Sequence, residues 1–453
     1  MSAPISRYEQ NRADQEARDA LKRPWVSSHI LTAYRWGMTV AEPAASIVLK
    51  LRCKKGKEDP VRIAERRGFA GLQRPQGSLI WMHGASVGET LSLLPIIERL
   101  VLRGMKVLIT SGTVTSAHVL ARRLPPGAFH QYIPLDVPRY IARFLEHWQP
   151  DLVLMAESDL WPNLISSVHR NRIPLVLVNA RLSDRSYKRW KHFPQVAQAI
   201  LSCFSLALAQ TSADSERLSL LGLTHVGVTG NLKFDVPPPP ADLEAVAILN
   251  GAISGRPVWA AASTHEGEEE QIIQVHRRLE ARFPNLLTLI IPRHAERGHN
   301  IMMMLPSRGL KGAQRSRGDA LTRDINVYVA DTMGEMGLFY RISALVFMGG
   351  SLVEHGGQNP IEPAKLGAGL IHGAHVFNFK DVYAALLRNN GAIAVSDVNG
   401  LTHAVAHLLG EPSALRNLSR SAQTVVSDLG GAVERTMQSL EPYLMSLKIS
   451  TRS

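Results

Sequence analysis

A carboxylate that could act as a general base stands at Glu89. It closes the stretch His83-Gly84-Ala85-Ser86-Val87-Gly88-Glu89, which follows the short apolar run 78–82 and precedes a helical pattern over 91–102. Strand, glycine loop and helix in this order form the opening unit of a parallel α/β sheet, and ligands bind at the carboxyl ends of such strands. A carboxylate in this place could take a proton from a substrate hydroxyl.

The same residues also fit a purely structural role. Ser86 and Glu89 have the spacing of a capping box, in which two side chains at a helix start satisfy backbone N–H groups. An acidic side chain in the first turn also complements the positive end of the helix dipole. The local sequence leaves both roles open, so the rest of the chain must decide between them.

Further charged groups follow other expected strands in the first half. Glu157 opens the run Glu157-Ser158-Asp159-Leu160-Trp161-Pro162-Asn163, a second run covers 179–183, and Lys233 lies in Gly230-Asn231-Leu232-Lys233-Phe234-Asp235. Because the carboxyl ends of parallel strands meet at one edge of a sheet, we expect these groups on the rim that holds Glu89. Taken singly, Trp161-Pro162 is also typical of a helix start, and Lys233 of an ordinary surface lysine.

Glycine loops, an arginine and acidic residues follow the expected strands of the second half. Glycine loops that lead into a helix N-terminus can hold phosphate, an arginine adds charge, and a glutamate one turn into a helix can accept from ribose hydroxyls. A turn or a helix cap would explain each cluster alone, but together they favour a nucleotide site. The clusters are Pro292-Arg293-His294, Met333-Gly334-Glu335-Met336, Gly349-Gly350-Ser351 and Gly356-Gly357-Gln358-Asn359-Pro360-Ile361-Glu362.

Two parallel α/β sheets are needed to position these clusters. Strand and helix patterns alternate from Ser78 onward, pause at the proline run 236–240 and then start again, and 453 residues exceed one ordinary core. We predict a basic segment 1–75, Rossmann-like domains 76–235 and 236–430 with a cleft between them, and a C-terminal helix 431–453. The expected strands are 79–83, 106–110, 130–134, 152–156, 174–178, 206–210, 225–229, 258–262, 286–291, 326–330, 344–349, 369–372 and 392–395.

Positive charge is concentrated in the first half of the chain. Residues 1–235 hold 31 Lys and Arg against 19 Asp and Glu, whereas residues 236–453 hold 20 of each, so the first half carries the whole net charge of +12. A basic half beside a neutral half indicates an anionic partner, such as an anionic membrane surface or a phosphorylated lipid. The sequence shows no zinc-ligand spacing and no aromatic-rich basic motif, which disfavours nucleic acid.

The segment from Ile30 to Leu51 is more apolar than its surroundings. Arg35 and Glu42 interrupt it and Pro43 breaks the helix, so it is a poor transmembrane span. With Trp25, Tyr34 and Trp36 near one end and the basic run 52–57 at the other, it resembles an interfacial helix. A helix packed on its own domain explains the pattern equally well.

Several classes of protein lack support in this sequence. The two cysteines, Cys53 and Cys203, are too few for a disulfide framework. No dinucleotide fingerprint and no phosphate-binding P-loop motif is present, which disfavours a dehydrogenase and a P-loop enzyme. No acidic D-x-D-like pair stands beside the nucleotide loops, so we expect neither a metal ion nor a cofactor.

The clusters together resemble the transferases of 3-deoxy-D-manno-octulosonic acid (Kdo) in lipopolysaccharide synthesis. The resemblance runs in order from about Leu31 to Tyr443. The motifs that carry it are GASVGE (84–89), ESDLWPN (157–163), NARLS (179–183), GNLKFD (230–235), PRHAER (292–297), DTMGEM (331–336), GGS (349–351) and GGQNPIEPA (356–364), with early support from 56–58 and 65–68. This chain has Asp159 where the family usually has Glu, and Gln358 where it has His.

The resemblance implies a GT-B glycosyltransferase that moves Kdo from CMP-Kdo to a lipid A precursor with inversion. It also implies an N-terminal membrane-associating helix and a peripheral or monotopic place on the cytoplasmic face of the inner membrane. The family's general base falls on Glu89, and its transition-state stabilisers fall on Glu157 and Lys233. The CMP contacts fall on Pro292, Arg293, Met333, Gly334, Glu335, Asn359, Pro360, Ile361 and Glu362.

The chemistry of glycosyl transfer agrees with this division of labour. An oxocarbenium-like transition state calls for a carboxylate base in one domain, and for cationic or backbone groups around the departing nucleotide in the other. Two alternatives remain open from the sequence. One is another GT-B nucleotide-sugar enzyme, of the sialyltransferase or epimerase type, and the other is a catalytically inactive membrane-binding module.

Overall fold

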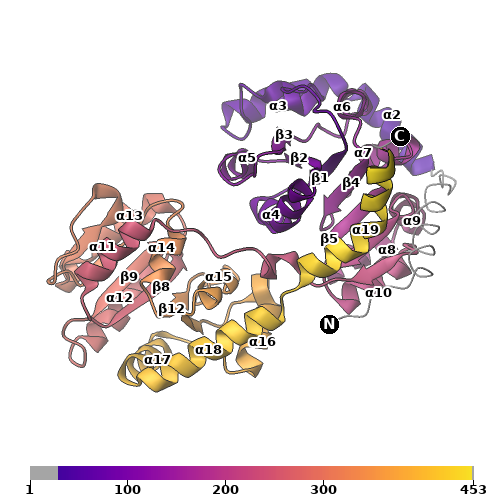
Figure 1. Cartoon of the computed structure of the whole chain (residues 1–453). Helices are drawn as coiled ribbons and strands as arrows, with labels where there is room; N and C mark the ends of the chain where they lie inside the picture. The colour runs from indigo at the N-terminus through magenta and orange to yellow at the C-terminus, as the bar shows by residue number, and fades with distance from the viewer. Residues whose placement is uncertain (1–28, 451–453) are drawn as a thin grey trace. The chain divides into compact units, whose positions relative to one another are not determined.

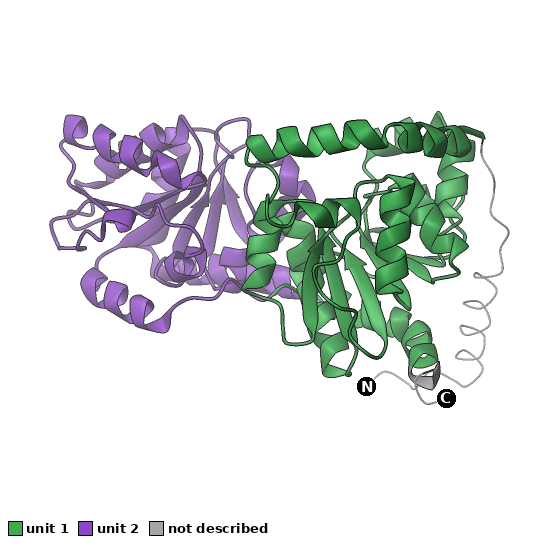
Figure 2. Cartoon of the chain, turned by 90° about the horizontal axis from the view of Figure 1, so that it is seen from above, with its two compact units in different colours: residues 1–236, 430–453 green, residues 237–429 purple. Residues whose placement is uncertain are grey.

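The computed structural model describes residues 29–450, which form two compact units (Figure 2). Unit 1 comprises residues 1–236 and 430–453, and unit 2 comprises residues 237–429. Trp25 and the rest of the predicted segment before residue 29 lie outside the described residues.

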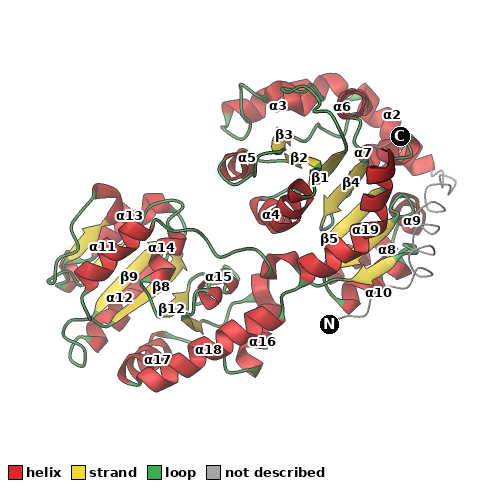
Figure 3. Ribbon diagram, in the orientation of Figure 1, coloured by secondary structure: helices red, strands yellow, loops and turns green. Residues whose placement is uncertain are grey.

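Unit 1 is built on a seven-stranded parallel sheet of order β3-β2-β1-β4-β5-β6-β7 (Figure 3). Its strands are β1 Leu79–His83, β2 Lys106–Ser111, β3 Ala128–Tyr132, β4 Leu152–Ala156, β5 Leu175–Ala180, β6 Leu206–Ala209 and β7 Val226–Val228. The helices that follow these strands are α4 Val87–Leu102, α5 Val114–Ala121, α6 Pro138–Trp148, α7 Pro162–Arg170, α8 Asp184–Lys191, α9 Pro194–Leu201 and α10 Ser212–Leu220.

Side chains of β1 show why this sheet is covered on both faces. Trp81 belongs to a core shared with α6, α7 and α9, whereas Ile80 and Met82 belong to a second core shared with α4. Since successive side chains of a strand point to opposite faces, an entirely apolar strand must be covered on both.

The C-terminal helix α19 Ala432–Ser450 completes the second of these cores. Its apolar residues Val433, Met437, Leu440 and Leu444 pack there beside α4. Asp235, at the end of unit 1's first segment, accepts from the N–H groups of Gly431 and Val433 at 2.7 and 2.5 Å and fixes the start of α19. The yellow end of the chain therefore returns to the sheet formed by the indigo and magenta segments (Figure 1).

Unit 2 contains a second seven-stranded parallel sheet, of order β10-β11-β9-β8-β12-β13-β14. Its strands are β8 Val258–Thr264, β9 Leu287–Pro292, β10 Gly312–Gln314, β11 Val327–Val329, β12 Leu345–Met348, β13 Gly369–His372 and β14 Ala392–Ala394. Its helices are α11 Leu243–Ile253, α12 Glu268–Leu279, α13 Gly298–Met304, α14 Met336–Arg341, α15 Ile361–Lys365, α16 Lys380–Arg388, α17 Val398–Gly410 and α18 Pro412–Asp428.

The predicted α/β class and the two parallel sheets are confirmed. Every strand expected from the sequence is present, with ends shifted by a few residues. The sequence missed β10, because its three residues Gly312–Gln314 contain no apolar run and begin with glycine.

The segment before the first sheet forms two helices, α2 His29–Val40 and α3 Glu42–Lys54. The break falls at Ala41, two residues before Pro43, which lies in the first turn of α3. The predicted interruption of the helix near Pro43 is confirmed. Both helices pack against unit 1, since Leu31 and Leu49 are buried and the Tyr34 hydroxyl donates to Asp136 at 3.0 Å. Within residues 29–450, no helix combines the length and the apolarity needed to cross a bilayer.

Candidate active site

Glu89 lies in the first turn of α4, beside the carboxyl end of β1. The Oγ of Ser86 accepts from the Glu89 N–H at 3.3 Å and donates to Oε1 of Glu89 at 2.8 Å, while Oε2 accepts from the N–H of Ala85 at 2.8 Å. The helix cap expected from the sequence is thus formed. The Glu89 carboxylate, however, accepts from the N–H of Ala85, whereas in a standard capping box it would accept from the N–H of Ser86. Gly84 allows this geometry, because a Cβ there would lie 3.1 Å from the Glu89 Cβ.

The electrostatic environment of Glu89 differs from that of an ordinary capping residue. Burial raises its pKa, and the negative charge of Glu157 adds to the rise. Hydrogen bonds from Ser86 and Ala85 and the charge of His83 act in the opposite direction without cancelling it. A carboxylate with a raised pKa is a stronger base than a free one, so its role need not end with the cap.

Glu157 and Lys233 form an ion pair at the same sheet edge. The Lys233 Nζ lies 2.7 Å from Oε1 of Glu157, and both side chains are only partly exposed. A Cβ placed on Gly88 would lie 3.9 Å from the Lys233 Cε, so the lysine reaches the first turn of α4. The loops after β1, β4 and β7 therefore bring Glu89, Glu157 and Lys233 together, as the sequence predicted.

Asn179 of β5 holds the loop that carries Lys233 in place. Its side chain is fully buried, and its Oδ1 accepts from the Leu232 N–H at 3.0 Å. The 3₁₀ turn Leu232–Phe234 that carries Lys233 also has its own cap, since Oδ1 of Asn231 accepts from the Lys233 N–H at 3.0 Å. The side-chain amides of Asn179 and Asn231 thus fix the backbone of the turn and place Lys233 where it can bind Glu157.

A histidine–aspartate pair that the sequence did not assign to the site lies next to it. The buried His83 ring bonds through Nε2 to Asp159 Oδ2 at 3.1 Å and through Nδ1 to the Thr110 Oγ1 at 2.9 Å. The Trp161 indole also donates to Asp159 at 2.8 Å. Burial alone would raise the pKa of Asp159, but the hydrogen bond and charge of His83 and the bond from Trp161 lower it below its ordinary value. The sequence could have indicated His83 as a site residue, because it stands at the carboxyl end of β1, directly before the glycine loop.

In unit 2, a buried carboxylate organises the glycine loop after β12. Glu268, the first residue of α12, is fully buried and accepts from the N–H groups of Gly350, Ser351 and Leu352 at 2.6, 3.0 and 3.0 Å. It also accepts from the His265 N–H at 2.9 Å. The sequence did not indicate this residue, because Glu268 stands in an acidic run that is typical of a helix start.

Basic and aromatic side chains gather beside this loop. The His265 and His355 rings stack at 4.2 Å, and Nε2 of His265 lies 3.1 Å from Nε2 of Gln358. Burial lowers the pKa of His265 to about 4, and the neighbouring His355, His294 and Arg293 contribute in the same direction. Arg293 follows Pro292 at the end of β9 and is exposed. An exposed guanidinium beside a glycine loop is suited to an anionic ligand.

The other predicted donor residues follow neighbouring strands. Met333, Gly334 and Glu335 come after β11, and Asn359, Pro360, Ile361 and Glu362 come after β12, in the strand sequence β11-β9-β8-β12. Glu335 is engaged by Arg315 at 2.7 Å, and the hydrogen bond from that guanidinium lowers the pKa of the carboxyl. Asn359 accepts from the Ile361 N–H at 3.1 Å and donates to Oε1 of Glu362 at 3.3 Å, which shapes the start of α15. The sheet thus collects these loops at one edge.

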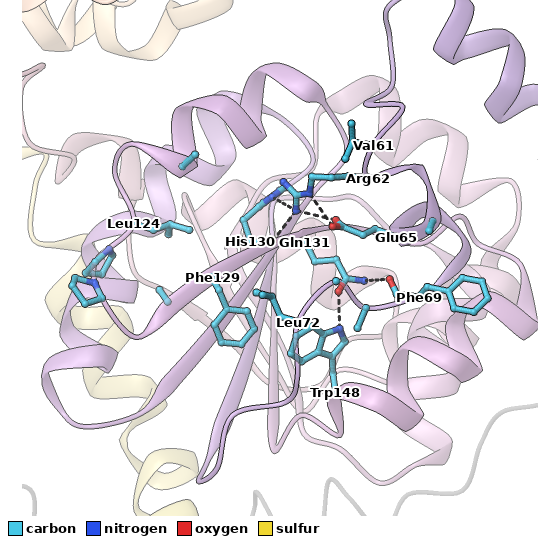
Figure 4. A pocket seen from close by; sticks show the side chains of 17 residues that line it. Val61, Arg62, Glu65, Phe69, Leu72, Leu124, Phe129, His130, Gln131 and Trp148 are labelled. Carbon is cyan, nitrogen blue, oxygen red and sulfur yellow. Dashed lines mark hydrogen bonds and ion pairs between the residues drawn. The ribbon is translucent and has the colours of Figure 1, made fainter.

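A pocket of about 710 Å³ opens elsewhere in unit 1, along the free edge of β3 (Figure 4). Its polar groups are already paired: Arg62 binds Glu65 at 2.8 Å and the His130 carbonyl at 2.8 Å, and Gln131 accepts from the Trp148 indole at 2.9 Å. Burial and the Arg62 charge lower the pKa of His130 to about 3, so its ring stays neutral. These contacts protect an edge strand. Across the described part of the chain, no three His, Cys, Asp or Glu side chains gather as metal ligands would.

Comparison with known proteins identifies the family of this chain. Residues 61–236 match the family model described as 3-deoxy-D-manno-octulosonic-acid transferase (kdotransferase). A 3-deoxy-D-manno-octulosonic acid transferase of Haemophilus influenzae is 35% identical over 90% of this chain and 97% of its own length. A probable mitochondrial transferase of the same name from Arabidopsis thaliana is 35% identical over 86% of this chain and 90% of its own.

Among solved structures, a UDP-GlcNAc 2-epimerase of Neisseria meningitidis, bound to UDP-GlcNAc, matches 80% of this chain and 99% of its own. The TM-score is 0.55 at 17% identity, so this likeness concerns the fold alone. The sequence relatives go further, because they are at least one-third identical and cover nearly the whole chain. The chain belongs to the family of 3-deoxy-D-manno-octulosonic acid transferases.

Proposed function

We propose that this protein transfers Kdo from CMP-Kdo to a hydroxyl of a lipid A precursor, with inversion at the sugar carbon. The acceptor oxygen forms a bond to the anomeric carbon of Kdo, the bond from that carbon to the CMP phosphate breaks, and CMP leaves with the bonding electrons. Glu89 takes the proton of the attacking hydroxyl. The observation that carries this assignment is the half-buried Glu89, with its raised pKa, beside the Glu157–Lys233 pair in a chain of this family.

Lys233 and Glu157 have two further roles in unit 1, which are stabilisation of charge and positioning of the lysine. The Lys233 ammonium offers positive charge near the place where the acceptor loses its proton, and Glu157 holds it there through the 2.7 Å ion pair. Glu157 also keeps the pKa of Glu89 high. Fixed charges of this kind stabilise a developing charge without reorganising during the reaction.

The loops of unit 2 are suited to the nucleotide of the donor. Arg293 supplies a charge-assisted hydrogen bond to phosphate, and Glu268 fixes the neighbouring glycine loop through its backbone N–H groups. Glu335 and the Asn359–Glu362 segment would contact the sugar and base of CMP. In this proposal unit 2 supplies the donor's nucleotide site and unit 1 supplies the base, Glu89.

We also propose that the protein lies on the cytoplasmic face of the inner membrane, attached through α2 and α3. The exposed apolar side chains of these helices support this, including Trp36, Val40, Ile47, Val48 and Leu51, with Trp36 70% exposed. Basic residues follow at the end of α3. Apolar groups next to lysines and arginines suit an anionic lipid surface.

Mass analysis of lipid products tests the function directly. The purified protein should add the mass of Kdo to a lipid A precursor when CMP-Kdo is supplied, and should add nothing when CMP-sialic acid or UDP-GlcNAc replaces it. Conversion of UDP-GlcNAc without any lipid product would instead support an epimerase. A protein that binds lipid but leaves every donor intact would support the inactive module and refute the transferase.

A further inference from the structure

A second hollow of unit 1 lies between α2 and α7, and no step of the proposed reaction uses it. It has a volume of about 400 Å³, and its walls include Leu31, Arg35, Trp36, Asn163, Ser166 and Arg170. Both helices contribute apolar and polar groups to its walls. They are Leu31, Trp36, Thr32, Arg35 and Thr39 from α2, and Pro162, Asn163, Ser166 and Arg170 from α7. Such a lining suits an amphiphile rather than a purely polar or purely apolar ligand.

The position of α2 over α7 is fixed by a buried carboxylate. Asp136 accepts from the N–H groups of Asn163 and Leu164 at 3.1 and 2.9 Å, and so caps α7. The same carboxylate accepts from the Tyr34 hydroxyl of α2 at 3.0 Å. Leu31, one turn before, is buried in the core of unit 1. The hollow is therefore built into the fold.

The two arginines lack a carboxylate partner. Among residues 29–450, no acidic side chain lies within ion-pair distance of Arg35 or Arg170, and the only side-chain bond from Arg170 goes to the Ser167 Oγ at 2.9 Å. Of the carboxylates nearby, Asp136 caps α7 and Glu42 lies 3.7 Å from Arg139. Glu146 lines a neighbouring hollow but forms no ion pair with either arginine. Burial lowers the pKa of Arg170, and the charge of Arg35 adds to the effect. An anion between the two guanidinium groups would relieve their repulsion.

The neighbouring hollow extends the site. It has a volume of about 660 Å³ and shares Arg35 and Arg170 with the first, and its other polar groups include Ser167, Asn171 and Glu146. The arginine pair thus borders both spaces, and each of them has apolar as well as polar walls. A phosphate monoester on the polar head of a lipid could lie between the two guanidinium groups, while the apolar residues contact the hydrocarbon part.

The hollow also adjoins the candidate active site. Pro162 and Asn163 line it and directly follow Trp161, whose indole donates to Asp159 at 2.8 Å. Asp159 in turn bonds His83, at the end of the strand that leads to Glu89. The hollow runs along α7 from Pro162 at its start to Arg170 at its end. A ligand held by the two arginines would therefore extend along α7 to reach the candidate active site.

We propose that Arg35 and Arg170 bind a phosphate group of the lipid acceptor, while Leu31 and Trp36 contact its hydrocarbon part. The proposal rests on the proposed function for the identity of the acceptor. It assigns α2 a part in substrate recognition, separate from attachment to a membrane.

The test is a binding cycle in neutral detergent micelles. The full chain, Arg35→Ala and Arg170→Ala are titrated with a phosphorylated lipid A precursor and with the same lipid after phosphatase treatment. Arg122→Ala is the matched control, because Arg122 is an exposed arginine at the end of α5 that lines neither hollow. Each site variant should bind the phosphorylated lipid about tenfold more weakly, the worth of one exposed charge-assisted hydrogen bond. The control should match the unchanged protein.

The dephosphorylated lipid provides the decisive comparison. It should bind the unchanged protein and both variants with equal, weakened affinity, and the acceptor KM should rise in the variants while the KM for CMP-Kdo stays constant. Equal losses on dephosphorylation in all proteins would overturn the proposal. It would also be overturned if phosphatidylglycerol competed as well as the precursor, since the arginines would then serve bulk phospholipid. Arginine-dependent binding without any Kdo transfer would refute the proposed function and still support the phosphate site.

Discussion

Replacing Glu89 by glutamine separates the two roles that its position allows. In the folded protein the carboxylate accepts one bond from the Ala85 N–H and one from the Ser86 hydroxyl. A glutamine amide can keep both contacts, because its oxygen accepts from Ala85 and its NH₂ group donates to the Ser86 Oγ. The helix cap should survive, and the stability of the protein should change little.

The effect on the rate should be large. Glutamine cannot take the proton of an attacking hydroxyl, and loss of a general base costs about 10²–10⁴-fold in rate. This corresponds to about 2.7–5.5 kcal/mol of activation free energy. CMP binding should persist, because the loops proposed to hold CMP belong to unit 2, whereas Glu89 belongs to unit 1.

Ser86→Ala is the matched control for loss of the cap. It removes the side chain that accepts from the Glu89 N–H and that donates to Oε1, and should lower the stability of the protein by about 1 kcal/mol. It leaves the carboxylate in place, so its single-turnover rate of Kdo transfer should stay within a few-fold of the unchanged enzyme. A Glu89→Gln protein that transfers Kdo at nearly the full rate would refute the reasoning, and Glu157 would become the candidate base.

Three further predictions follow from the same contacts. Glu157→Gln removes a negative charge that raises the pKa of Glu89, so the acid limb of the kcat/KM profile should move to lower pH; an unmoved limb would disconnect the two carboxylates. Arg293→Ala should weaken CMP binding by about 1.5–3 kcal/mol, and Glu362→Ala should weaken it by a smaller amount. If calorimetry finds the CMP affinity of both variants unchanged, neither residue belongs to the CMP site. Binding to anionic vesicles should be measurable by co-sedimentation at low salt and should weaken as salt rises, whereas failure to bind at low salt would contradict membrane attachment.

The parts of this fold that sequence reasoning recovered are those with strong local signals. Apolar runs such as 79–83 and 152–156 are fully buried strands, and the glycine-rich turn and Ser86-x-x-Glu89 spacing marked the start of α4. The rule that parallel strands share a carboxyl edge then brought Glu157 and Lys233 to Glu89 without any structure. Periodicity and topology were sufficient for these residues.

The missed features depend on contacts between distant segments. Glu268 reads as one acidic residue among three at a helix start, and only the fold shows that it accepts from residues more than 80 positions away. The pairing of His83 with Asp159 joins residues 76 positions apart. The return of α19 to unit 1 depends on Asp235, which reads locally as the end of a loop. No local pattern encodes such partners, because the partner's position is set by the complete sheet.

Two residues of the candidate site, Glu157 and Asn179, have strained backbone conformations. Glu157 directly follows β4, and Asn179 is the penultimate residue of β5. Both have left-handed backbone conformations, with φ of 57° and 52°. Asparagine adopts this region readily, but glutamate does so at a cost of about 1 kcal/mol or more, which surrounding contacts must offset. The Lys233 ion pair and the backbone bond from the Glu157 N–H to the Val178 carbonyl at 3.0 Å supply such contacts. A glycine would relieve the strain but would lose the ion pair with Lys233 and the charge that raises the pKa of Glu89, so the strained glutamate is explained by chemistry at the site and not by the stability of the turn.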